Sequence, residues 1–89
     1  MNDIERAIGS MLVTHLFVEV PEARLTPDDR LRSDLGLDSL GFVELRVQCE
    51  DTFGITISDA HFTPENFTSI RTVADLVRTL QGSSLTAGG

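Results

Sequence analysis

The sequence contains no tryptophan, no tyrosine and no lysine. Its core must therefore be built from aliphatic side chains and the five phenylalanines. All seven basic residues are arginine, and fourteen acidic residues give a net charge of −7. Protein surfaces that bind the backbone of DNA or RNA, or an anionic membrane, carry the opposite charge. The composition thus excludes nucleic-acid and membrane partners and favours proteins with basic surfaces.

Cysteine and long apolar runs are also scarce. The single cysteine, Cys49, has no partner for an internal disulfide, which fits a reducing compartment. No apolar run approaches the roughly 20 residues of a membrane span. The first ten residues, MNDIERAIGS, are acidic and helical in pattern, unlike a signal peptide. We therefore expect a cytoplasmic, free-standing protein.

Apolar residues recur at helical spacing in several segments. The pattern predicts longer helices over about 3–17, 39–53 and 72–80, and a short helix over 63–67. The expected fold is all-α: a small four-helix bundle with a long loop between the first two helices. We expect residues 1–81 to form one domain and residues 82–89 to be a disordered tail.

Capping residues support these limits. Asn2 and Glu5 have the spacing of a capping box, Asp38 stands before the second helix, and Gly54 follows it. Thr63 and Thr72 are the expected caps of the two later helices, and Gly82 should end the last one. In the loop over 19–37, the sequence predicts that four leucines are anchors against the bundle: Leu25, Leu31, Leu35 and Leu37.

The second predicted helix has two apolar rows. The first row, which we expect to face the core, contains Phe42, Leu45, Cys49 and Phe53. The second row contains Leu40, Val43 and Val47, and Glu44, Glu50 and Asp51 flank it. Burying that row as well would also bury charge, which is costly. We therefore interpret it as an acid-rimmed docking surface for a partner, the alternative being that both rows are core.

Ser39 stands at the head of this helix, in Gly36-Leu37-Asp38-Ser39-Leu40-Gly41. The glycines are at the wrong offsets for the nucleophile elbow of serine hydrolases. Nothing in the sequence brings His15 or His61 to Ser39, and the acidic residues and histidines lack metal-ligand spacing. We therefore expect no catalytic site and no metal site. Taken alone, Ser39 is an ordinary first-turn serine.

Its context changes that interpretation. Residues 31–55, LRSDLGLDSLGFVELRVQCEDTFGI, resemble the acyl carrier protein family. The shared features are the Leu-Gly-x-Asp-Ser-Leu core, the acidic and apolar helix after it, and the Glu-Asp-x-Phe-Gly-Ile ending. The predicted helices on either side also fall at the spacing of that family, so the resemblance covers nearly the whole chain.

The resemblance implies that Ser39, preceded by Asp38, carries a covalent 4′-phosphopantetheine arm. A phosphopantetheinyl transferase would attach the arm from coenzyme A, and its thiol would hold acyl groups as thioesters. The implied protein is a monomeric carrier, not an enzyme, that serves acyl-loading and condensing enzymes with basic docking patches. Gly41 and Arg46 depart from the common family pattern, which argues against service to the housekeeping fatty-acid enzymes. We expect a role in polyketide, fatty-acid-like or other secondary-metabolite synthesis.

Two other hypotheses remain. A peptidyl or aminoacyl carrier of nonribosomal peptide synthesis would share the fold and Ser39, and would differ only in its cargo. A helical adaptor would bind a partner without covalent modification. The sequence does not identify the cargo or the pathway.

Overall fold

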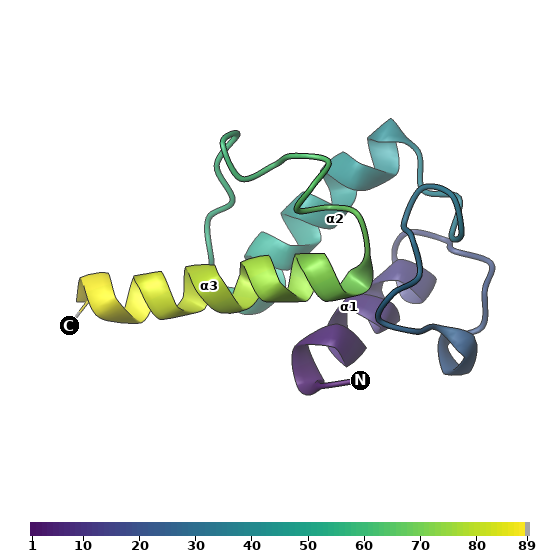
Figure 1. The fold of residues 1–89 in the computed structure, drawn as a ribbon, viewed down its shortest axis with the longest axis horizontal. Coiled ribbons are helices and arrows are strands. Elements are labelled where there is room, and N and C mark those ends of the chain that lie inside the picture. Colours follow the sequence, from purple (N-terminus) through teal and green to yellow (C-terminus); the bar gives the residue numbers. More distant parts are fainter. Residues whose placement is uncertain (89) are drawn as a thin grey trace.

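The computed structural model describes residues 1–88, and side chains as far as Gly82. It contains three α-helices, α1 (Asp3–Thr14), α2 (Ser39–Phe53) and α3 (Ile70–Gly88), and the short 3₁₀ turn η1 (Glu22–Arg24). Each α-helix packs against the other two, and Figure 1 shows α3 as the longest of them. The described residues form no β-strand, only an isolated bridge between Arg30 and Ser69. The predicted all-helical class is confirmed.

Helix α1 begins as predicted and ends earlier. The side chain of Asn2 accepts a hydrogen bond from the Glu5 N–H, and the side chain of Glu5 accepts one from the Asn2 N–H. These two bonds complete the capping box. The helix was expected to reach residue 17 and ends at Thr14. Phe17 has a left-handed φ of 58°, which is uncommon for a bulky residue, and its side chain is 85% exposed. The predicted end was too late because apolar residues continue at helical spacing in the sequence after Thr14, where the backbone leaves the helix.

The predicted short helix over 63–67 is a single turn. The Phe67 N–H donates to the Thr63 carbonyl at 3.0 Å, and the Asn66 N–H donates to the Thr63 hydroxyl at 3.2 Å. The turn does not continue into a helix, and at its end the Thr68 hydroxyl donates to the Pro64 carbonyl. Thr63 is a cap as expected, but the four-helix count is not confirmed. The short turn η1 has no counterpart among the predicted elements.

Both predicted ends of the last helix are wrong. Helix α3 begins at Ile70, and Ser69 and Thr72 exchange backbone-to-side-chain bonds around its first turn, so Ser69 precedes the helix and Thr72 lies inside it. The helix also continues through Gly82 to Gly88. A glycine lowers helix propensity by about 1 kcal/mol relative to alanine, which is not enough to end a helix by itself. Residue 89 of the predicted tail lies outside the described residues.

The long loop before α2 is packed down as the leucine spacing predicted. All four of its anchoring leucines are buried. The loop also bonds to the start of α3: the Arg71 guanidinium makes a bidentate ion pair with Asp28 at 2.8 and 3.1 Å, and the Leu31 N–H donates to the Thr68 carbonyl at 2.9 Å. The loop therefore fixes the point at which the chain enters α2.

The core lies between the three helices and this loop. Its largest fully buried side chains come from each of these elements and, for Ile57, from the segment between α2 and α3: Ile8, Leu12, Leu31, Leu45, Cys49, Ile57, Ile70, Val73 and Val77. No helix in the described part of the chain combines the length and the apolar character needed to span a membrane.

Candidate functional site

Ser39 is the first residue of α2 and lies on the surface. Asp38 precedes it as the N-cap, and the Asp38 carboxylate accepts from the Gly41 N–H at 2.8 Å. Gly36, with a left-handed φ of 72°, turns the chain towards the helix. The Ser39 hydroxyl has no hydrogen-bond partner among the described residues. It is an exposed primary alcohol at the junction between the long loop and α2.

A hollow of about 510 Å³ lies beside Ser39, between α2 and the segment that leads to α3. The surface of the hollow is mostly apolar, and its apolar residues come both from α2 and from the segment that leads to α3. The lining residues are Arg30, Arg32, Ser33, Ser39, Phe42, Val43, Phe62, Thr63, Pro64, Phe67 and Thr68. The hollow was not predicted from the sequence, because it depends on how the 57–68 segment packs across α2.

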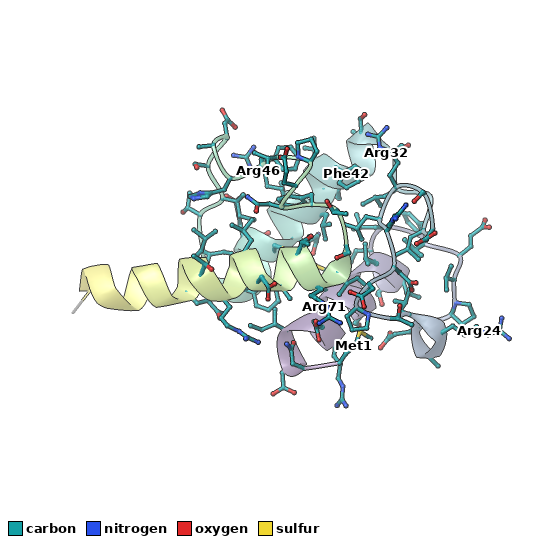
Figure 2. The ribbon with its side chains drawn as sticks, in the orientation of Figure 1. Met1, Arg24, Arg32, Phe42, Arg46 and Arg71 are labelled. Atoms are coloured by element: carbon teal, nitrogen blue, oxygen red, sulfur yellow. The ribbon has the colours of Figure 1, made fainter. Side chains whose placement is uncertain are left out.

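Aromatic contacts and one arginine hold that segment in place. Phe62 and Phe67 meet edge to face with ring centroids 4.9 Å apart. The Arg46 guanidinium lies 5.0 Å from the Phe62 ring centroid, pairs with Asp59 at 3.0 Å, and donates to the Ile57 carbonyl. Figure 2 shows Arg46 and Phe42 on the same side of the molecule. Arg46 thus fastens the wall of the hollow to α2.

The second apolar row of α2 is exposed. Leu40 is 78% exposed, Val43 49% and Val47 42%. Leu45 and Cys49 of the first row are fully buried, and Phe42 and Phe53 are partly buried against the core. The alternative that both rows are core is therefore wrong. The helix presents one row to the core and the other to solvent.

The acidic residues beside this row have two different surroundings. Glu44 and Asp51 are exposed, as expected for a rim. Glu50 is only partly exposed, and its carboxylate accepts from the Ile57 N–H at 2.8 Å. Because Glu50 anchors the chain after α2, its first role is internal.

The other reactive side chains lie apart from Ser39. Cys49 is fully buried, and its sulfur lies 4.0 Å from that of Met11. Burial, with a smaller contribution from the negative charge of Glu50, raises the pKa of the Cys49 thiol to about 12. His15 is the C-cap of α1, His61 bonds to Ser58, and neither lines the hollow. No cluster of three or more metal-ligand side chains occurs in the described part of the chain.

Comparison with known proteins places this geometry in a family. Residues 13–80 match the family model described as "Phosphopantetheine attachment site". Two curated relatives named "Acyl carrier protein" come from Aster yellows witches'-broom phytoplasma (strain AYWB) and Onion yellows phytoplasma (strain OY-M). Each is 43% identical over 70 residues, which are 79% of this chain and 83% of the relative.

The chain is therefore a phosphopantetheine-attachment domain. Within that class, it belongs to the acyl carrier protein family. The prosthetic group of this family is 4′-phosphopantetheine. The residues present fit such a group, because the chain has an accessible hydroxyl on Ser39 and a mostly apolar hollow beside it.

Proposed function

We propose that Ser39 carries the 4′-phosphopantetheine arm and that the protein shuttles acyl groups on it as thioesters. The observation that carries this proposal is the exposed, unbonded Ser39 hydroxyl at the head of α2. The helix N-terminus adds a positive dipole that favours a phosphodiester there. Asp38 supports the site by capping the helix and holding the junction.

In this function the protein is a carrier and not an enzyme. When attached, the arm supplies a thiol that forms thioesters. The chain's own residues present Ser39 to other proteins and hold its surroundings rigid. No histidine lines the hollow beside Ser39, so we assign the proton transfers of attachment and loading to the partner enzymes.

The exposed row of α2 is the proposed docking surface for those partners. Leu40, Val43 and Val47 would fill the desolvated centre of the contact, and Glu44 and Asp51 would meet basic residues at its edge. The proposed partners are a phosphopantetheinyl transferase and acyl-loading and condensing enzymes. Glu50 would contribute mainly by holding the end of α2.

We place this carrier in the cytoplasm as a monomer, in polyketide, fatty-acid-like or other secondary-metabolite synthesis. The domain is proposed to span residues 1–81, which is supported by the family match that ends at residue 80. The names of the two relatives favour an acyl cargo over a peptidyl or aminoacyl one. The mass of the loaded protein, purified from its native host, would distinguish these cargoes.

The attachment site is tested with coenzyme A, magnesium and a phosphopantetheinyl transferase. Intact-protein mass should rise by one 4′-phosphopantetheine for the parent and not at all for Ser39→Ala. Ser33→Ala is the matched control, because Ser33 is also exposed and lines the same hollow. It should be modified like the parent. Modification of Ser39→Ala would contradict the assignment, and an unmodified parent would favour the non-covalent adaptor.

A further inference from the structure

Two arginines line the hollow beside Ser39. Arg30 and Arg32 come from the loop before α2, and both are exposed. The Arg32 guanidinium lies 5.6 Å from the centroid of the Phe42 ring, and Figure 2 shows the two side chains next to each other. In a chain of net charge −7, they place positive charge beside a hollow whose other walls are mostly apolar.

Neither guanidinium is neutralised by an ion pair within the described residues. The ion pairs there join other arginines, Arg46 with Asp59 and Arg71 with Asp28. The carboxylates closest in sequence are already engaged: Asp28 by Arg71, Asp29 by the Thr26 N–H, Asp34 by the Arg30 N–H and Asp38 by the Gly41 N–H. The two guanidinium groups therefore retain their donors for an anion from outside the chain.

We propose that Arg30 and Arg32 bind the phosphodiester of the arm on Ser39 and so direct the arm into the hollow. This inference rests on the proposed attachment at Ser39. A phosphodiester on the Ser39 hydroxyl would stand at the edge of a hollow that Ser39, Arg30 and Arg32 all line. Guanidinium groups match phosphate oxygens in both charge and geometry.

The remaining walls suit the rest of the arm. Beyond the phosphate, pantetheine carries two methyl groups and a flexible chain, and the hollow offers Phe62, Pro64 and Phe67. Exposed ion pairs are weak and are screened by salt. The arm would thus be held between reactions and released when a partner docks, because the contact is reversible.

The test is ³¹P NMR of the protein carrying the arm, without cargo. We expect Arg30→Gln/Arg32→Gln to shift the phosphodiester resonance at low salt. The parent resonance should approach that of the variant as salt rises. Arg24→Gln is the matched control, because Arg24 is exposed, does not line the hollow and lies well away from Arg32 in Figure 2. It should give the parent resonance at every salt concentration.

A second measurement follows the arm itself. In the parent, nuclear Overhauser effects should connect the pantetheine methyl groups to the rings of Phe62 and Phe67. The double variant should lose them while its circular dichroism stays that of the parent. Identical ³¹P resonances in parent and double variant at all salt concentrations would overturn the proposal.

One further result would also overturn it. The ³¹P resonances and nuclear Overhauser effects of parent and double variant could differ only when the thiol carries a dicarboxylic acid as its half-thioester. The bound anion would then be the free carboxylate of the cargo and not the phosphodiester. Failure of the proposed function is distinguishable from both results. If Ser39 does not accept the arm, the mass does not rise and there is no phosphorus resonance to compare.

Discussion

Leu37 occupies the space that a side chain on Gly41 would need. A Cβ built on Gly41 would lie 2.8 Å from Leu37 Cδ1 and 2.9 Å from Leu37 Cγ. Leu37 is buried in the core and is one of the four anchors of the long loop. Gly41 thus lets the loop pack closely against the first turn of α2. From the sequence alone, this glycine was only a departure from a family pattern.

Gly41→Ala should therefore destabilise the protein, although alanine is the better helix former. The gain in helix propensity is about 1 kcal/mol, whereas overpacking a buried side chain costs about 1–3 kcal/mol. Gly82→Ala is the control, because a Cβ there meets no atom within 4 Å in α3. Urea unfolding should show a lower midpoint for Gly41→Ala and an equal or higher one for Gly82→Ala. Equal stabilisation by both changes would contradict the packing argument.

Leu45 and Leu40 should differ sharply in their contribution to stability. Leu45 is fully buried and Leu40 is 78% exposed on the same helix. Leu45→Ala should cost about 2–5 kcal/mol, and Leu40→Ala should change the stability by about 0.5 kcal/mol or less. Thermal unfolding of the two variants measures this directly. A similar loss of Tm in both would mean that the two rows of α2 have been assigned to the wrong faces.

Glu44→Arg and Val47→Asp should impair arm transfer in different ways. Rim charges mainly raise the association rate, and salt screens them over a Debye length of about 8 Å at physiological ionic strength. Glu44→Arg should therefore slow transfer most at low salt and converge with the parent as salt rises.

Val47→Asp places a charge in the proposed desolvated centre of the contact, so it should slow transfer at every salt concentration. The measurement is transfer rate against carrier concentration at several salt levels, with circular dichroism as the control. Parent-like rates for both variants under all conditions would show that the transferase does not dock on this surface.

Alkaline pH should destabilise the fold through Cys49. Burial raises the pKa of this thiol from its ordinary 9.0 to about 12, so above pH 9 the unfolded chain loses a proton that the folded protein keeps. The unfolded state then binds fewer protons, and stability falls as pH rises, by up to about 1.4 kcal/mol per pH unit between these two values. The chain has no lysine or tyrosine to titrate in the same range.

Urea unfolding between pH 8 and 11, under reducing conditions, measures this slope. Cys49→Ala should unfold more easily at pH 8 because it leaves a cavity, but its stability should not decline in the same way above pH 9. The same decline in parent and variant would assign the effect to other groups.

The sequence predicted α2 and its surroundings well, because the signals there are local. Asp38 and Gly54 bracket the helix as caps, and its two apolar rows separate a buried face from an exposed one. The burial of Leu31 and Leu35 also followed from their spacing. Ser39 could be located, but its modification was implied only by the resemblance to a family.

The features that sequence analysis missed depend on contacts between distant segments. From the sequence, Arg46 was only a departure from the family pattern, yet its side chain contacts Asp59, Ile57 and Phe62 in the segment that follows α2. Glu50 looked like a rim acid and instead bonds to the Ile57 N–H. Neither partner could be inferred from periodicity, which describes one helix at a time.

The backbone bonds between the long loop and the start of α3 have a consequence for how the protein opens. The Leu31 N–H donates to the Thr68 carbonyl, and the Arg71 N–H donates to the Pro27 carbonyl at 2.8 Å. These amide hydrogens can exchange with solvent only when the two segments separate. Although the loop is mostly irregular, it should share its protection against exchange with the first turn of α3. The long loop before Ser39 and the first turn of α3 would then open together as one cooperative unit, although they are far apart in the sequence.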